Sequence, residues 1–158
     1  MTRVILLLAV PVMIAPMLAT APASREPPPG PALQGTGQVD LVQVQLNAPR
    51  KVRIGKTFTV MDQVENQGEW EAQTTVTGFY LSTDDQFDEK DLLVAARRVP
   101  RLDVRQGQTG TTPITLKENV APGDYYLIAV ANARRDVEER YLTNNTRAVK
   151  LTVQPPGK

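Results

Sequence analysis

The stretch APGDYYLIAVAN, residues 121–132, is the part of the sequence that decides the fold class. Its Pro-Gly pair predicts a turn, and the run from Tyr125 to Ala131 has apolar residues on both alternating sets of positions. Such a run is typical of a central strand that is covered on both faces. A tyrosine of PGDYY also stands where the strand begins. This position suits a tyrosine corner, a motif in which the tyrosine hydroxyl donates a hydrogen bond to main chain a few residues upstream.

The segments on either side alternate with a period of two residues, as half-buried strands do. TFTVMDQVEN, residues 57–66, places Phe58, Val60 and Val64 on one face. Asp62 falls on that same apolar face. We expect its carboxylate to accept a hydrogen bond from a hydroxyl or a main-chain amide.

Seven such segments follow one another at a spacing of roughly 8–12 residues, which is typical of a two-sheet sandwich. We therefore expect an all-β fold, an immunoglobulin-like seven-stranded antiparallel β-sandwich. In VDLVQVQLN, residues 39–47, the face of each residue is ambiguous because Leu41 and Val42 are adjacent. The predicted core residues are Phe58, Val60, Val64, Phe79, Leu81, Leu93, Tyr125, Leu127, Ile128 and Val149.

Composition excludes several kinds of chemistry. The 158-residue chain has no Cys and no His, and serine occurs only at Ser24 and Ser82. Disulfides, thiolate nucleophiles and a Ser-His-Asp triad are therefore excluded, and the usual nitrogen and sulfur ligands of zinc are missing. We predict a protein that is not an enzyme and requires no cofactor. A paired-carboxylate glycosidase is the only chemistry that the composition leaves open.

The first residues have the features of a secretory signal peptide. Arg3 precedes an apolar run from Val4 to Leu18, and small residues then predict cleavage after Ala21 or Ala23. The run is shorter than the roughly 17–25 residues that a membrane span needs. We expect a secreted or periplasmic protein with no membrane span in its mature form.

Charge gives no reason to expect nucleic acid as a partner. Cleavage removes one of the 18 basic residues and leaves 17 against 17 acidic ones. A neutral surface of mixed sign does not attract a polyanion. The predicted organisation is a signal peptide over 1–23, a Pro/Gly-rich linker over 24–38, a domain over 39–154 and a tail over 155–158.

Five blocks of the sequence together resemble the CARDB family, the bacterial cell-adhesion-related immunoglobulin-like domain, over about residues 38–153. They are VDLVQVQLNAP, GKTFTVMDQVENQG, GFYLSTDDQFDEKDLLVAARRVPRL, APGDYYLIAVAN and EERYLTNNTRAV. The resemblance implies an exported, non-catalytic interaction module that presents loops or a sheet face to a protein or glycan of the cell envelope. Family members often sit among many modules of large surface proteins. A single module behind a signal peptide instead favours a free subunit or a periplasmic module.

The resemblance also draws attention to a loop rich in aspartate. Similar family members tend to read Y-L-S-x-D-x-x-x-D-x-x-D there, and Asp84, Asp88 and Asp91 fill the aspartate positions. Calcium binds six to eight oxygen ligands, so these three residues are candidate Ca²⁺ ligands, although Lys90 adds a competing cation. The alternative is a solvated loop whose aspartates cap turns.

Two further sets of residues are singled out. Trp70 is the only tryptophan and is a candidate partner-binding residue, either as an exposed anchor or as a half-buried residue at one end of the sandwich. Arg97, Arg98, Arg101 and Arg105 form a local basic cluster. Because successive strand residues face opposite ways, Arg97 and Arg98 are not expected to share a patch.

Two alternative functions stay open. A carbohydrate-binding module needs exposed aromatic residues, whereas only 5% of the residues are aromatic. A structural subunit of an envelope assembly would polymerise through exposed strand edges. The sequence predicts no oligomeric state.

Overall fold

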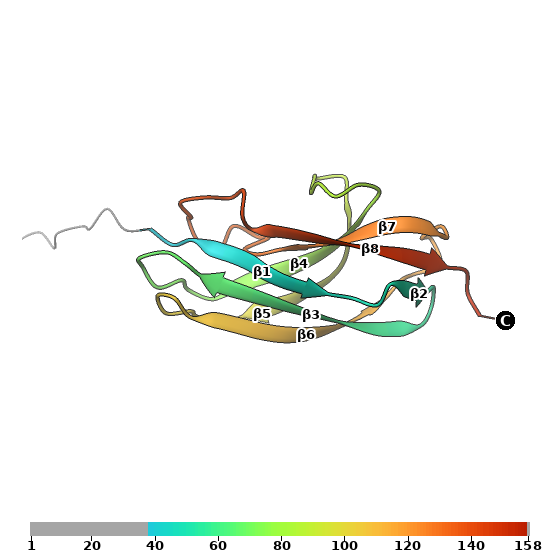
Figure 1. Ribbon diagram of the computed structural model, residues 1–158, viewed down its shortest axis with the longest axis horizontal. Helices are drawn as coiled ribbons and strands as arrows, with labels where there is room; N and C mark the ends of the chain where they lie inside the picture. The colour runs from blue at the N-terminus through green and yellow to red at the C-terminus, as the bar shows by residue number, and fades with distance from the viewer. Residues whose placement is uncertain (1–37, 158) are drawn as a thin grey trace, which may run out of the picture. The chain divides into compact units, whose positions relative to one another are not determined.

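The computed structural model describes residues 38–157, which form two β-sheets packed face to face (Figure 1). No helix occurs in that range, and none of the described residues forms a segment that could span a membrane as a helix. The predicted signal peptide, and the predicted linker apart from Gln38, lie outside the described residues.

Eight strands make up the two sheets. They are β1 (Leu41–Asn47), β2 (Lys51–Arg53), β3 (Thr57–Asn66), β4 (Thr75–Ser82), β5 (Leu92–Val99), β6 (Gly107–Thr115), β7 (Gly123–Val130) and β8 (Thr146–Gln154). One sheet has the order β1-β3-β6 and the other the order β2-β8-β7-β4-β5. This confirms the predicted all-β sandwich.

The eighth strand is β2, which the seven-strand prediction treated as part of a bend. After β1 the chain crosses from the three-stranded sheet to the five-stranded one, where β2 pairs with the end of β8. Val52 and Ile54 are buried there, so the short strand is held by burial as well as by pairing. The β2–β8 pair is parallel, which departs from the expected all-antiparallel arrangement.

Most of the predicted core is confirmed. Val60, Val64, Phe79, Leu81, Leu127 and Ile128 are buried, and Phe58, Tyr125 and Val149 pack against the core while partly exposed. The prediction for Leu93 is wrong, because its side chain is 55% exposed. A register shift in the β4–β5 pair puts Leu93 opposite Tyr80 instead of the buried Leu81, and Tyr80 is on the outer face of β4.

The turn before β7 has the predicted tyrosine corner. The hydroxyl of Tyr125 donates a hydrogen bond of 3.1 Å to the carbonyl of Ala121. This bond fixes the direction in which the chain enters the central strand β7.

A polar layer divides the core into two apolar clusters. The larger cluster includes Val60, Phe79 and Ile114, and the smaller one includes Val64 and Val99. Between the clusters, five strands each contribute one residue to the interior, at positions where an apolar side chain is usual. They are Gln43 of β1, Asp62 of β3, Thr77 of β4, Arg97 of β5 and Gly110 of β6.

An ion pair at the centre of this layer links the two sheets. Arg97 reaches from β5 to Asp62 on β3, with Nε–Oδ1 at 2.6 Å and Nη2–Oδ2 at 2.8 Å. The Asp62 side chain is fully buried, and that of Arg97 is 11% exposed. Gln43 donates to the same carboxylate at 3.2 Å, and Arg97 donates to Gln108 Oε1 of β6 at 3.0 Å. The expectation of a hydroxyl or main-chain partner for Asp62 is therefore wrong.

Two backbone features make room for the ion pair. A Cβ at Gly110 would lie 2.6 Å from Arg97 Cζ, so only glycine leaves space for the guanidinium against β6. A bulge in β1 between Gln43 and Gln45 turns both Gln43 and Leu46 toward the interior. The bulge also resolves the ambiguity of the alternation in this segment.

We expect Asp62→Leu and Arg97→Met each to lower the free energy of unfolding by about 3–5 kcal/mol, because each leaves a buried charge without its partner. The double variant Asp62→Leu/Arg97→Met is expected to cost clearly less than the sum of the two. Urea denaturation of the four proteins in a double-mutant cycle measures the coupling.

The exposed pair of Arg101 and Asp103 is the matched control, because both side chains are more than half exposed. Asp103→Ala should leave the denaturation midpoint close to that of the parent. Small and additive effects of the two core substitutions would show that the ion pair does not hold the sheets together.

Candidate functional site

Three loops and the start of the described chain meet at one end of the sandwich, on the left in Figure 1. These are residues 67–74 between β3 and β4, 100–106 between β5 and β6, 131–145 between β7 and β8, and 38–40. Residues 38–40 join two of the loops: Gln38 O accepts from Glu69 N and Val39 O from Arg140 N, both at 2.9 Å. We call this surface the Trp70 end.

Large apolar side chains are exposed at the Trp70 end. Trp70 is 48% exposed, and Val104, Tyr141 and Leu142 are exposed to a similar degree. Beneath them lies the smaller apolar cluster, which includes the fully buried Leu102. Aromatic and aliphatic side chains above a packed base are the features that binding surfaces share.

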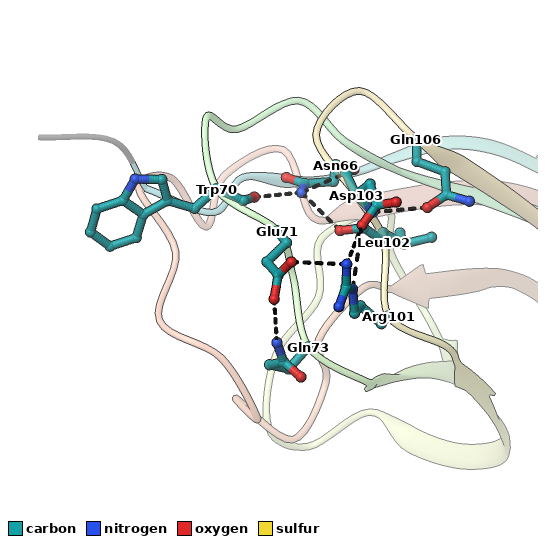
Figure 2. A network of polar contacts seen from close by, with 8 residues as sticks. All are labelled: Asn66, Trp70, Glu71, Gln73, Arg101, Leu102, Asp103 and Gln106. Atoms are coloured by element: carbon teal, nitrogen blue, oxygen red, sulfur yellow. Dashed lines mark hydrogen bonds and ion pairs between the residues drawn. The ribbon is translucent and has the colours of Figure 1, made fainter. Parts of the chain in front are cut away.

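The buried side chain of Asn66 organises two of the loops (Figure 2). Its amide nitrogen donates to the carbonyl of Trp70 at 2.7 Å and to that of Leu102 at 3.3 Å. Its amide oxygen accepts from the main-chain nitrogen of Gly68 at 3.1 Å. One side chain therefore fixes the main chain that carries Trp70 to the neighbouring loop.

The loop between β5 and β6 contains a residue in a left-handed conformation. Arg105 has φ of 61°, which costs a non-glycine residue about 1 kcal/mol or more. The conformation is held because Arg105 N donates to Asn66 O at 2.8 Å and Asn66 N donates to Gln106 O at 2.9 Å. Asn66 thus fixes this loop through its main chain as well as its side chain.

An ion-pair bridge lies on the outside of the same loops (Figure 2). Arg101 Nη2 lies 3.0 Å from Glu71 Oε2 and 2.8 Å from Asp103 Oδ1. All three side chains are about half exposed or more, so solvent weakens the attraction and the bridge contributes little to stability.

A second hub, which is partly buried, holds the loop between β7 and β8. The carboxylate of Glu139 accepts from Leu41 N at 2.6 Å and from the side-chain amides of Asn132 and Asn145, both at 2.7 Å. Burial raises the pKa of Glu139 above its ordinary value, and the nearby Asp40 carboxylate adds to the rise, while the three hydrogen bonds oppose it. Leu41 lies at the start of β1, so this hub attaches the loop of Tyr141 to the N-terminal strand.

The aspartate loop lies between β4 and β5, away from the Trp70 end. Each candidate calcium ligand is used within the loop: Asp84 Oδ1 accepts from Gln86 N at 2.9 Å, Asp88 Oδ1 from Lys90 N, and Asp91 Oδ2 from Asp88 N at 3.0 Å. No three acidic side chains converge as a metal site in residues 38–157. The chemistry of the donors suits calcium, but their arrangement does not form a coordination shell, so calcium binding stays a prediction.

The basic cluster is not a single patch. Arg97 points into the core, whereas Arg98 and Arg101 are exposed and Arg105 belongs to the loop that Asn66 holds. The opposite orientation of Arg97 and Arg98 agrees with the expectation from strand geometry.

Sequence reasoning missed Asn66 and Glu139 as the residues that hold the Trp70 end. Asn66 stands in no charged cluster or motif, whereas Glu139 stands in a run of charged residues of both signs, 134–140. For Asn66 the only signal in the sequence was an asparagine at the end of a predicted strand. For Glu139 it was one acid among the three of DVEER, and neither signal is specific.

Comparisons with known proteins confirm the resemblance found in the sequence. Residues 38–149 match the CARDB family. A CARDB domain from Pyrococcus furiosus, crystallised in complex with di-metal ions, has a similar fold with a TM-score of 0.56 and 20% identity, over 74% of this chain and 90% of that one. A domain of a proposed cell surface protein from Methanosarcina acetivorans has a TM-score of 0.54 and 19% identity, over 73% and 92%. No curated protein matches the sequence.

We expect Asn66→Asp to lower the free energy of unfolding by about 3 kcal/mol, because a carboxylate would replace the buried donor that faces the main-chain carbonyls. Fluorescence of Trp70, the only tryptophan, should also shift to longer wavelength as its loop loosens. The same exchange at the exposed Asn47 is the control and should change neither quantity. Unchanged stability in Asn66→Asp would remove Asn66 as the organiser of the loops.

Glu139 should make stability depend on pH. Its pKa is higher in the folded state than in the unfolded chain, so the folded state gains stability when the carboxyl binds a proton. Relative to Glu139→Gln, the free energy of unfolding of the parent should therefore rise as pH falls from about 7 to about 4, near the ordinary pKa of glutamate. Urea denaturation of both proteins across this range measures the difference. A constant or falling difference would contradict the raised pKa.

Proposed function

Because the chain belongs to the CARDB family, an adhesion-related and non-catalytic family, we propose that it is an exported interaction module whose Trp70 end binds a protein or glycan of the cell envelope. The observation that carries the proposal is that Trp70, Tyr141 and Leu142 are each about half exposed on loops whose bases are fixed by buried polar side chains.

Fixed loops favour binding for an entropic reason. Ordering a mobile side chain or loop on association costs free energy, and loops that are already held avoid part of that cost. The hydrogen bonds of Asn66 and Glu139 hold the loops in advance. Aromatic anchors then bury a large area for few rotatable bonds, which makes Trp70 and Tyr141 the expected hot spots.

Three of the acids at this end are engaged in contacts that favour a binding role over a catalytic one. The carboxylates of Glu71 and Asp103 are paired with Arg101, and that of Glu139 accepts three hydrogen bonds. A glycosidase needs one carboxyl to give a proton and a second to act as base or nucleophile. Carboxylates engaged in this way are poorly placed for either role.

The direct test is binding of labelled protein to envelopes isolated from the cells that produce it. We expect saturable binding by the parent, and Trp70→Ala to lose about 2 kcal/mol of binding free energy, or roughly thirtyfold in affinity. Leu93→Ala is the matched control, since Leu93 is equally exposed but lies on β5. Equal loss in both variants, or no loss in Trp70→Ala, would contradict the proposal.

Pretreatment of the envelopes separates the two classes of partner. Protease should abolish binding if the partner is a protein, and periodate should do so if it is a glycan. The glycan outcome would place this chain among carbohydrate-binding modules, with Trp70 stacked on a sugar ring.

We propose, second, that Ca²⁺ binds to the aspartate loop through Asp84, Asp88 and Asp91. The proposal is supported by the oxygen chemistry of these ligands and by the complex of the similar Pyrococcus furiosus domain with di-metal ions. Because the carboxylates already accept main-chain N–H groups, binding would have to rearrange the loop, and affinity is expected near ~10⁻⁴–10⁻³ M.

Calcium should then raise the melting temperature of the parent, and Asp88→Asn should remove the rise. Melting curves recorded in calcium chloride and in chelator provide the measurement, with Asp103→Asn as a control outside the loop. Identical curves for the parent under the two conditions would end the calcium proposal and leave the interaction proposal intact.

A further inference from the structure

A groove of about 900 Å³ opens at the end of β1, the end opposite to that held by Glu139. Its lining comes from the passage between β1 and β2, from the start of β7 and from β8 (Figure 1). The lining includes the apolar side chains of Leu46, Ala48 and Val149. Sites for small ligands usually measure about 300–1,000 Å³ and combine apolar walls with a few polar groups. The size and the mixed lining therefore fit a small ligand.

The sheet edge beside the groove is closed, so a bound molecule has to use side chains. β1 lies beside β8, and hydrogen bonds join the chain to this segment at both ends of the stretch. At one end Gln43 N donates to Asn144 O at 3.1 Å, and at the other Thr152 N donates to Arg50 O at 2.8 Å. A peptide would find no free strand edge to pair with there. Recognition in the groove therefore depends on charge, on side-chain hydrogen bonds and on contact with a ring.

The lining carries an excess of positive charge. Arg50, Lys51 and Lys150 are exposed there, and none of them forms an ion pair within residues 38–157. Asp124 is the one acid in the lining, and its carboxylate already accepts the hydroxyl hydrogen bond of Thr152 at 2.8 Å. The cations come from two segments, the start of β2 and the middle of β8, so a ligand with repeated negative charges complements them.

An aromatic ring lies next to one of these cations. Lys150 Nζ lies 5.2 Å from the centroid of the partly exposed Tyr126 ring. A sugar that packs its C–H face on this ring would bring a carboxylate of its own within reach of the Lys150 ammonium group. Asn47 and Thr83 add an exposed amide and an exposed hydroxyl to the lining, and these groups donate and accept hydrogen bonds as sugar hydroxyls do.

We propose that the groove binds an acidic oligosaccharide, a short sugar chain with carboxylate groups. The three cations supply the preference for negative charge, and Tyr126 supplies a surface for a sugar ring. A peptide is a poorer fit, because its main-chain N–H and C=O groups would lose water without gaining a strand partner. The groove lies away from the Trp70 end, and the proposal does not depend on binding there.

The experiment uses tetragalacturonate, with its methyl ester as the matched comparison, because the ester keeps the sugar rings and loses the charges. Isothermal titration calorimetry gives the affinity of the protein for each, and NMR shifts of the Tyr126 and Lys150 amides locate the contact. We expect the acid to bind at least about tenfold more tightly than the ester. A glutamate peptide with the same number of carboxylates should bind more weakly than the sugar acid, because it offers no ring to Tyr126.

Charge reversal tests the location of the site. Arg50→Glu and Lys150→Glu alter exposed side chains, so both variants should fold, and each should weaken binding of tetragalacturonate about tenfold. Arg98→Glu is the matched control, since it makes an equal change of net charge at an exposed position on β5 and should leave binding unchanged. Trp70→Ala should also leave it unchanged.

Four results would overturn the proposal. They are no binding up to about 1 mM tetragalacturonate, equal affinity for the acid and its ester, equal affinity for the acid and the glutamate peptide, and binding that survives Lys150→Glu. Loss of tetragalacturonate binding in Trp70→Ala would overturn it as well, because the sugar would then lie at the other end. Absence of binding to envelopes bears on the Trp70 end and leaves the result with tetragalacturonate untouched.

Discussion

The buried ion pair between Arg97 and Asp62 is the contact on which the arrangement of the two sheets depends. A sandwich without cysteine has no disulfide between its layers, and apolar packing alone tolerates sliding more readily than a directional contact does. Here a planar guanidinium from β5 meets a carboxylate from β3 through two short hydrogen bonds and also reaches Gln108 on β6. Because a buried charge without its partner is costly, few other alignments of the sheets are compatible with this sequence.

The same contact determines where the exposed loops lie. Asp62 is four residues before Asn66, which holds the main chain of Trp70, and Arg97 is four residues before Arg101, which bridges the next loop. Fixing Asp62 against Arg97 therefore fixes the bases of the two loops relative to each other. The Glu139 hub adds the third loop and the N-terminal strand. The interaction surface that we propose at these loops gains a defined shape in this way, although none of the residues that fix it has to touch a partner.

More of the fold than of the candidate site could be predicted from the sequence, for physical reasons. Alternation and turn residues are local signals, and they were enough for the sandwich, the tyrosine corner at Tyr125 and most of the core. Leu93 was misplaced because a bulge shifts the register of its strand, and a bulge leaves little trace in a single sequence. The partner of Asp62 was missed because it is 35 residues away, and sequence spacing carries no information about contacts across two sheets. The roles of Asn66 and Glu139 depend on the same kind of distant contact. Trp70 could be singled out as a candidate because a lone tryptophan beside a turn is conspicuous, and its role in binding stays a prediction.

The most direct measurement of the central contact is hydrogen exchange at the Nε–H of Arg97, followed by NMR with the exposed Arg101 as an internal reference. A guanidinium that is 11% exposed and hydrogen-bonded to a fully buried carboxylate should exchange with water far more slowly than that of Arg101, whose side chain is 56% exposed. Slow exchange at Arg97 that becomes fast in Asp62→Leu is the predicted result. Exchange at Arg97 as fast as at Arg101 in the parent protein would show that the two sheets are not joined by this pair.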